Sequence, residues 1–184
     1  MKPKRSRRAV FLVGFMGAGK NRVGRALARQ LAWGFVDLDR RVQARQGRSI
    51  ARIFRESGEA AFRKAETTEL KALLKEQRRS RGAVVALGGG VPAVAANRRL
   101  LRGALTVFLE VPVGRLWERC RADRRRRPLA TSEASFRRLY QARRGHYAAA
   151  TLRLAAGDRS PQQLATRIAQ WLGYESGTRP QERP

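Results

Sequence analysis

Gly14-Phe-Met-Gly17-Ala-Gly19-Lys20 carries the strongest structural signal in this chain. It fits the pattern G-x-x-x-x-G-K and lies between a short apolar run at 9–13 and a helical pattern at 20–31. Glycines let such a loop curl so that backbone N–H groups point inward at phosphate oxygens, and the following helix N-terminus adds partial positive charge. The sequence therefore predicts a phosphate-binding loop in which Lys20 reaches the β and γ phosphates. Its candidate ligands are Gly14, Gly17, Ala18, Gly19, Lys20, Asn21 and Arg22.

Short apolar runs alternate with helical patterns along the rest of the chain. The runs are apolar at successive positions, which is typical of strands buried on both faces of a parallel sheet. Strands that alternate with helices predict an α/β fold. The expected strands are 9–13, 35–36, 83–87, 105–109 and 151–154, and the expected helices are 20–31, 49–77 with a break near 57–58, 112–121, 134–147 and 161–172.

The composition is strongly basic. The 184 residues include 41 Lys and Arg against 14 Asp and Glu, a formal net charge of +27. One interpretation is a basic face that binds nucleic acid; the other is arginine spread over solvated surfaces. The 42% content of hydrophobic residues excludes a merely disordered basic tail.

Length and cysteine content restrict the organisation further. A chain of this length suits one domain, and a single cysteine, Cys120, excludes an intramolecular disulfide and a cysteine-rich zinc site. The apolar run at 9–13 is too short for a signal-peptide core or a membrane span, so we expect a cytoplasmic protein. The expected organisation is a disordered basic leader at 1–8, one domain at 9–172 and a disordered tail at 173–184.

The stretch at 121–133 differs from its surroundings. It holds five arginines within 121–127, followed by Pro128. Like charges repel one another, so the segment is poorly packed by itself. It is either a solvated loop or a mobile lid that orders when an anion neutralises it.

One position departs from the phosphate-loop pattern. The residue after Lys20 is normally Ser or Thr, whose hydroxyl ligates Mg²⁺, but here it is Asn21. An asparagine can offer a carbonyl oxygen, although its side chain is longer. We expect Mg²⁺ to be held mainly by ATP phosphates and by waters anchored on carboxylates. Weaker metal binding and an inactive descendant of an enzyme both stay open.

Two carboxylates mark the end of the second expected strand, Phe35-Val-Asp37-Leu-Asp39. At i and i+2 of an extended chain they share one face, and the carboxyl ends of strands are where open α/β sheets bind ligands. One carboxylate can orient a magnesium-bound water while the other accepts the proton of a substrate hydroxyl. The alternative is a helix N-cap at Asp39 with Asp37 solvated.

Seven blocks follow one another at compatible spacing: 14–20, 35–39, 47–54, 58–63 with Glu66, 87–90, 127–129, and Arg143 four residues before Tyr147. On these blocks the chain resembles the shikimate kinase family over residues 9–172. The resemblance implies a P-loop NTPase of the nucleoside-monophosphate-kinase-like type, a three-layer α/β/α domain with a five-stranded parallel sheet and a mobile lid. It also implies transfer of the γ-phosphoryl group of ATP to the 3-hydroxyl of shikimate, in aromatic amino-acid biosynthesis.

The resemblance implies roles for individual acceptor-side residues. Asp39 matches the aspartate that contacts the shikimate hydroxyls and is the candidate base, and Asp37 matches the one that positions Mg²⁺. Arg63 and Arg143 match two arginines that hold the substrate carboxylate, which suits the planar guanidinium. Glu66, one helical turn from Arg63, would hold that arginine's direction.

Further residues match the ring-binding, lid and adenine regions. Gly88, Gly89 and Gly90 would let bare backbone approach a hydroxylated ring, and Phe54 and Phe62 supply either an apolar wall or ordinary core. Arg127 matches the lid arginine that closes on the phosphates, and Arg124, Arg125 or Arg126 could substitute for it. The expected catalytic residues are Lys20, Asp39 and Arg127. The adenine region matches Arg119 or Arg121 and the loop 158–161 with Arg159, whereas Cys120 and His146 are expected to be structural.

Three alternatives compete with this reading. A gluconate-kinase-like enzyme would share the phosphate loop but would not need Arg63, Arg143 and the three glycines. A shikimate-kinase-like protein that binds without turnover is motivated by Asn21. A nucleic-acid-binding module predicts arginines gathered on one continuous face, whereas the sequence scatters them through every helix.

We expect ATP and shikimate as partners of a monomer, with no specific nucleic acid and no membrane.

Overall fold

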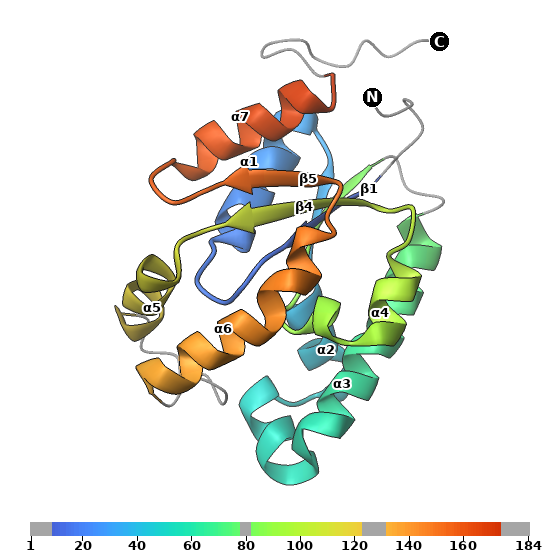
Figure 1. The fold of residues 1–184 in the computed structure, drawn as a ribbon. Coiled ribbons are helices and arrows are strands. Elements are labelled where there is room, and N and C mark those ends of the chain that lie inside the picture. Colours follow the sequence, from blue (N-terminus) through green and yellow to red (C-terminus); the bar gives the residue numbers. More distant parts are fainter. Residues whose placement is uncertain (1–8, 78–81, 123–131, 174–184) are drawn as a thin grey trace.

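A five-stranded parallel sheet forms the centre of the fold (Figure 1). The computed structural model describes residues 9–77, 82–122 and 132–173. The strand order is β2-β3-β1-β4-β5, and β1 lies in the middle, with Phe11 beside Val85 of β3 and Thr106 of β4. The predicted sheet is therefore confirmed. The strands are β1 (Ala9–Val13), β2 (Gly34–Asp37), β3 (Ala83–Ala86), β4 (Leu105–Glu110) and β5 (Leu152–Ala155).

Helices flank the sheet on both sides. In Figure 1, α1 (Lys20–Leu31) and α7 (Pro161–Trp171) lie together on one side, and α4 (Ala95–Leu100) and α6 (Glu133–Ala148) lie on the other. This arrangement confirms the predicted α/β/α layers. The remaining helices are α2 (Leu38–Gln46), α3 (Ile50–Gln77), the 3₁₀ turn η1 (Val91–Ala93) and α5 (Val113–Ala122).

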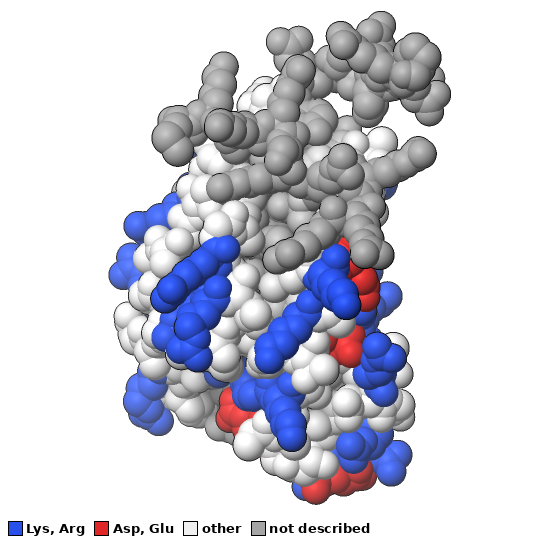
Figure 2. Space-filling view, turned by 90° about the vertical axis from the view of Figure 1, so that its right-hand side faces the viewer, with Lys and Arg blue, Asp and Glu red and all other residues white. Residues whose placement is uncertain are grey.

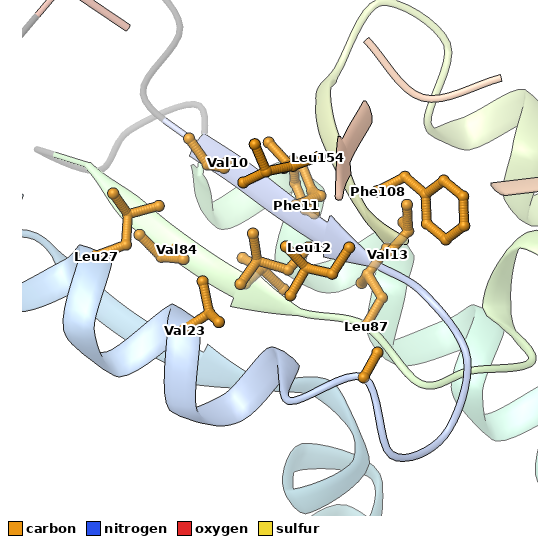
Figure 3. Packing of buried hydrophobic residues seen from close by; sticks show 14 of the residues in the cluster. Val10, Phe11, Leu12, Val13, Val23, Leu27, Val84, Leu87, Phe108 and Leu154 are labelled. Atoms are coloured by element: carbon orange, nitrogen blue, oxygen red, sulfur yellow. The ribbon is translucent and has the colours of Figure 1, made fainter. Parts of the chain in front are cut away.

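The central strand is buried on both faces, as continuous apolar runs predict. Val10 and Leu12 have no exposed surface. Leu12 lies close to α1, since a Cβ at Gly24 of that helix would lie 3.3 Å from Leu12 Cδ1. Figure 3 shows Leu27 of the same helix beside Val84 of the neighbouring strand β3. Burying each side chain of this kind contributes about 1.5–3 kcal/mol. The rigid sheet thus fixes the loops at its carboxyl edge, where the phosphate loop begins.

The second strand ends earlier than its sequence suggests. The prediction that Asp37 and Asp39 share a strand face is wrong, because Asp39 lies in the first turn of α2. The predicted alternative of a cap at Asp39 is wrong as well: Asp37 is the N-cap, and its Oδ1 accepts a hydrogen bond from Arg40 N at 3.3 Å. Asp37 is also not solvated, since its side chain is only 10% exposed.

The long helix α3 contains the predicted break. Gly58 has φ 78° and ψ 172°, so the helix changes direction there. The positive φ is a conformation that glycine adopts without a Cβ penalty. Helix α4 and the turn η1 were not predicted, because the segment around Pro92 is short and has no apolar periodicity.

The expected lid and termini fall mostly outside the described residues. Residues 1–8, 123–131 and 174–184 are not described. Of the lid expected at about 121–133, the structure describes 121 and 122 at the end of α5 and 132 and 133 at the start of α6. The lid itself stays a prediction. Ser132 caps α6 by accepting a hydrogen bond from Ser135 N. Within the described ranges, no helix is long and apolar enough to cross a membrane.

Arginine engages most of the acidic side chains in the described ranges. Figure 2 shows Lys and Arg in several separate groups on the face turned to the viewer, with acidic residues among them. Nine acidic residues in these ranges have a carboxylate oxygen within 4.0 Å of an arginine nitrogen: Asp37, Glu56, Glu59, Glu66, Glu69, Glu76, Glu110, Glu133 and Asp158.

Candidate active site

The phosphate loop runs from the end of β1 to the start of α1. Gly14, Gly17 and Gly19 all have positive φ, at 147°, 83° and 83°. Lys20 is folded over the loop, and its Nζ donates to Gly14 O at 2.8 Å and to Phe15 O at 3.1 Å. This arrangement makes a binding site for an anion, because the curled backbone, the helix N-terminus and the lysine all present positive charge or N–H donors.

Gly17 shows how α5 supports this loop. A Cβ at Gly17 would lie 2.9 Å from Cys120 Sγ and 3.0 Å from Leu116 O, both on α5. Any larger residue would therefore push the loop away from the helix. Cys120 is buried in the core, which agrees with the structural role predicted for it.

Asn21 and Asp37 contact one another beside the loop. Asn21 Nδ2 donates to Asp37 Oδ2 at 2.6 Å. The contact brings together the phosphate loop and the N-terminus of α2, which the chain separates by 16 residues. The departure from Ser or Thr at this position thus gives a direct side-chain link to the carboxylate expected to position Mg²⁺.

Gly88 lies between two carboxylates from different helices. A Cβ at Gly88 would lie 2.6 Å from both Asp39 Oδ1 of α2 and Glu66 Oε1 of α3. Only a glycine allows both side chains to approach the backbone this closely. The predicted glycine segment, candidate base and supporting glutamate are therefore brought together at the carboxyl edge of β3.

Glu66 is a buried acid with one partner. Its Oε2 accepts a hydrogen bond from Arg63 Nη1 at 2.8 Å, which confirms the predicted hold on that arginine. Its Oε1 has no hydrogen-bond partner among the residues that the structure describes. Burial raises the pKa of Glu66 to about 7, Arg63 opposes this shift, and Asp39 adds to it. The carboxyl therefore holds a proton more readily than an exposed glutamate does.

Two glutamates hold Arg63 in place. Besides Glu66, Glu59 accepts from Arg63 Nε at 3.1 Å and from Nη2 at 3.0 Å. Burial lowers the pKa of Arg63, but the two carboxylates outweigh burial and the net pKa is raised. The guanidinium also lies against Gly90, where any Cβ would overlap it. Arg63 is thus a fixed cation beside the glycine segment.

Arg143 is the second cation of this region. It is only 8% exposed on the inner face of α6. Burial lowers the pKa of Arg143, and Arg63 lies near enough to lower it further, although Tyr147 opposes the shift. Two guanidinium groups close to each other favour an anion between or beside them. The predicted carboxylate-binding pair therefore lies in one place.

The two phenylalanines pack together next to Arg63. The Phe54 and Phe62 ring centroids are 5.0 Å apart, and Arg63 lies over the Phe62 ring at 5.1 Å. Phe62 is 4% exposed and belongs to a small core cluster with Val42 and Ile53, whereas Phe54 is partly buried. Phe62 is therefore core, and Phe54 alone retains surface for a substrate wall.

An ion-pair network fixes α2 against α3. Arg41 Nε donates to Glu69 Oε2 at 3.0 Å, and Arg41 also forms a two-pronged pair with Glu76 at 2.6 and 2.8 Å. Arg45 Nε donates to Glu69 Oε1 at 3.0 Å. Arg41, Arg45, Glu69 and Glu76 were not singled out in the sequence, because their pairing depends on how two helices pack.

The expected adenine region gathers at the ends of α5 and β5. Arg119 Nη2 donates to Gly157 O at 2.8 Å, and Arg159 Nη1 donates to Ala155 O at 2.6 Å. Arg119 thus contacts the residue immediately before the loop 158–161, and a role of these residues in binding adenine stays a prediction. Arg22 is exposed and Arg121 is at the end of α5. Arg127, with Arg124, Arg125 and Arg126, lies outside the described residues.

Replacing Gly88 by Ala tests the crowding between the two carboxylates. We expect Gly88→Ala to lower phosphoryl-transfer activity by roughly 10- to 100-fold, since overpacking costs about 1–3 kcal/mol and here displaces Asp39. Steady-state kinetics with a thermal melt would measure both effects. Gly145→Ala is the control, because a Cβ there would meet no described atom within 4 Å apart from the adjoining backbone of its own helix. Equal activity of the two variants would contradict the close approach of Asp39.

The family of this chain is established by comparison with known proteins. A family model described as "SKI: Shikimate kinase" matches residues 16–173. The chain belongs to the shikimate kinase family. A curated shikimate kinase from Persephonella marina (strain DSM 14350 / EX-H1) is 35% identical over 162 residues, which are 88% of this chain and 96% of that one.

Solved structures support the same family and separate it from a related one. A shikimate kinase from Acinetobacter baumannii in complex with shikimate has 34% identity and a TM-score of 0.83, over 90% of this chain and 93% of that one. A gluconokinase from Sinorhizobium meliloti 1021 has only 17% identity and a TM-score of 0.56, over 92% and 94%. The second likeness shows the fold alone, so the shikimate kinase family is favoured over the gluconate-kinase-like alternative.

Proposed function

We propose that the protein transfers the γ-phosphoryl group of ATP to the 3-hydroxyl of shikimate, giving shikimate 3-phosphate and ADP. One observation carries the proposal: the segment Gly88–Gly90 lies against the phosphate loop and is flanked by Asp39, Arg63 and the nearby Arg143. A phosphate donor and a hydroxylated carboxylate would thus meet at the carboxyl edge of the sheet, in a chain that belongs to the shikimate kinase family.

The donor side of the site is the phosphate loop. Lys20 and the backbone N–H groups of the loop would hold the β and γ phosphates, with Arg22 at the rim. Arg127 from the lid would add positive charge as the phosphoryl group moves, because such transfers depend on positioning and charge stabilisation more than on covalent chemistry. Arg159 and Arg119 would border the adenine.

The acceptor side supplies orientation and a base. Arg63 and Arg143 would bind the shikimate carboxylate, and the approach of bare backbone at Gly88, Gly89 and Gly90 leaves room for the ring. Asp39 would take the proton of the 3-hydroxyl as the bond to phosphorus forms. Phe54 would cover an apolar part of the ring.

The residues present fit Mg²⁺ as a metal held mostly by its substrate. Mg²⁺ commonly keeps several waters and binds through one or two carboxylates together with substrate phosphates. Asp37 provides a carboxylate next to the loop, and its contact with Asn21 fixes its position. Asp37 would therefore hold magnesium-bound water, and Asn21 would orient Asp37. Bound Mg²⁺ would neutralise charge on the β and γ phosphates.

A coupled assay of ADP release tests the proposed function. ATP, Mg²⁺ and the purified protein are combined with shikimate, gluconate or no acceptor, and the product is identified by its mass. We expect rapid ADP release with shikimate only. Faster turnover of gluconate, or shikimate binding without any turnover at saturating Mg²⁺, would contradict the proposal. We also propose that the protein is a monomer and is located in the cytoplasm. Gel filtration tests the monomeric state.

Asn21→Ser tests why this chain departs from the usual phosphate loop. The change removes the amide that contacts Asp37 and restores a hydroxyl, so we expect a lower Mg²⁺ requirement or a higher kcat, by about three- to tenfold. Calorimetric titration of ADP binding against Mg²⁺ measures metal affinity independently of turnover. Asn21→Ala is the matched control, because it removes the amide without adding a hydroxyl. An unchanged or poorer metal dependence in Asn21→Ser would refute this account.

A further inference from the structure

Tyr147 is a fully buried residue at the end of α6 with no role in the function described so far. Its ring has no exposed surface and stacks on Phe108 of β4, with centroids 5.4 Å apart. Its hydroxyl donates a hydrogen bond to Gly89 O at 2.5 Å, across 58 residues of chain. Tyr147 therefore joins α6 to the middle of the glycine segment.

Arg143 lies one helical turn before Tyr147, and both side chains are buried. Residues four apart on a helix are neighbours on one face. Burial raises the pKa of Tyr147 above its ordinary value, although the positive charge of Arg143 opposes the shift, so the phenol keeps the proton that it gives to Gly89. The bond from Tyr147 to Gly89 thus ties the turn of α6 that carries Arg143 to the glycine segment.

Gly89 in turn lies against the phosphate loop. A Cβ at Gly89 would lie 3.4 Å from Met16 N and 3.6 Å from Gly14 O. Its neighbours Gly88 and Gly90 contact the side chains of Asp39 and Arg63. The Tyr147 hydroxyl is therefore attached to backbone that contacts both the donor side and the acceptor side of the site.

We propose that Tyr147 is a positioning residue that fixes the Arg143 guanidinium relative to the Gly88–Gly90 backbone. Arg143 would bind the acceptor's carboxylate and the glycine segment would contact its ring. The distance that Tyr147 fixes therefore determines where the acceptor hydroxyl lies relative to the phosphate loop. A small displacement of the acceptor hydroxyl lowers the rate strongly, because phosphoryl transfer requires the reacting atoms to be held in near-attack geometry. This inference rests on the proposed function.

Tyr147→Phe tests the proposal, since it keeps the ring packed on Phe108 and removes only the hydroxyl. We expect the dissociation constant for shikimate, measured by calorimetry, to rise about tenfold, because the Gly89 carbonyl loses its buried hydrogen-bond donor and α6 is no longer tied to the glycine segment. We expect kcat to fall by a similar factor. The dissociation constant for ADP should change by less than about twofold, because the Tyr147 hydroxyl bonds to Gly89 and not to the phosphate loop.

Tyr140→Phe is the matched control. Tyr140 lies on the same face of α6, is 7% exposed and packs edge-on against Phe15. Removal of its hydroxyl should leave the constant for shikimate unchanged. If Tyr147→Phe binds and turns over shikimate as Tyr140→Phe does, or loses only thermal stability, the positioning role is refuted.

A double-mutant cycle with Arg143→Lys shows whether Tyr147 acts through Arg143. In the Arg143→Lys background we expect Tyr147→Phe to change shikimate affinity by less than about twofold, because the partner that it aligns is already lost. Additive effects would overturn the proposal. If the unmodified protein neither binds nor phosphorylates shikimate, the proposed function is refuted. If it does both but the effects of the two substitutions are additive, only the positioning role of Tyr147 is refuted.

Discussion

We expect Asp39→Asn to lower kcat with shikimate by about 10²- to 10⁴-fold, the range for the loss of a general base. The KM for shikimate should change by only a few-fold. The amide keeps the shape of the side chain and its place between α2 and Gly88, but it does not accept the proton of the hydroxyl. Steady-state kinetics over a series of shikimate concentrations separates the two constants.

Glu133→Gln provides the control for this change. It also converts a carboxylate to an amide, but Glu133 is an exposed residue in the first turn of α6, paired with Arg137. Its kinetic constants should match those of the unmodified protein. If Asp39→Asn raises KM and leaves kcat nearly unchanged, Asp39 binds the substrate without acting as its base.

We expect Arg63→Ala to raise the KM for shikimate by about 10²-fold, because truncating one partner of a buried, hydrogen-bonded charge pair costs roughly 2–5 kcal/mol. The effect on kcat should be smaller. The same change leaves Glu66 buried without its cation. Glu66 then takes up a proton at neutral pH, because burial already raises the pKa of this carboxyl to about 7 and Arg63 opposes the shift. The variant should therefore also lose thermal stability.

Arg63→Lys separates binding from folding. The lysine keeps a charge beside Glu66 but does not present the planar fork that meets a carboxylate with two hydrogen bonds. We expect a raised KM for shikimate with a thermal midpoint closer to that of the unmodified protein. Arg137→Ala is the control, since it removes an exposed arginine from an i,i+4 pair. An unchanged KM in both Arg63 variants would refute carboxylate binding by Arg63.

Local patterns allowed much of this molecule to be predicted from its sequence. The phosphate loop, the strands and the break at Gly58 depend on glycines and apolar runs that act over a few residues. The pair Arg63–Glu66 was predictable for the same reason, because residues three apart on a helix are neighbours. In these cases the residues that interact in space are also close to one another in the sequence.

The rest depends on contacts between distant parts of the chain. The place of Asp39 was mispredicted because the capping of α2 by Asp37 ends the strand two residues earlier than the apolar pattern implies. The contact of Tyr147 with Gly89 requires α6 to pack against the loop after β3. The only signal for it in the sequence was the spacing of four residues between Arg143 and Tyr147, which puts both on one helix face.

The pairing of arginine with nearly every described carboxylate has a consequence for how the protein behaves in solution. With those acids engaged, the excess of 27 positive charges has little opposite charge left within the molecule, and the cations repel one another in the compact state. Raising the ionic strength from 0.01 to 0.15 M shortens the screening length from about 30 to about 8 Å. Exposed ion pairs lose less than about 1 kcal/mol each by this screening, whereas the long-range repulsion is largely removed. Dissolved anions thus serve as the counter-ions that the polypeptide itself does not supply.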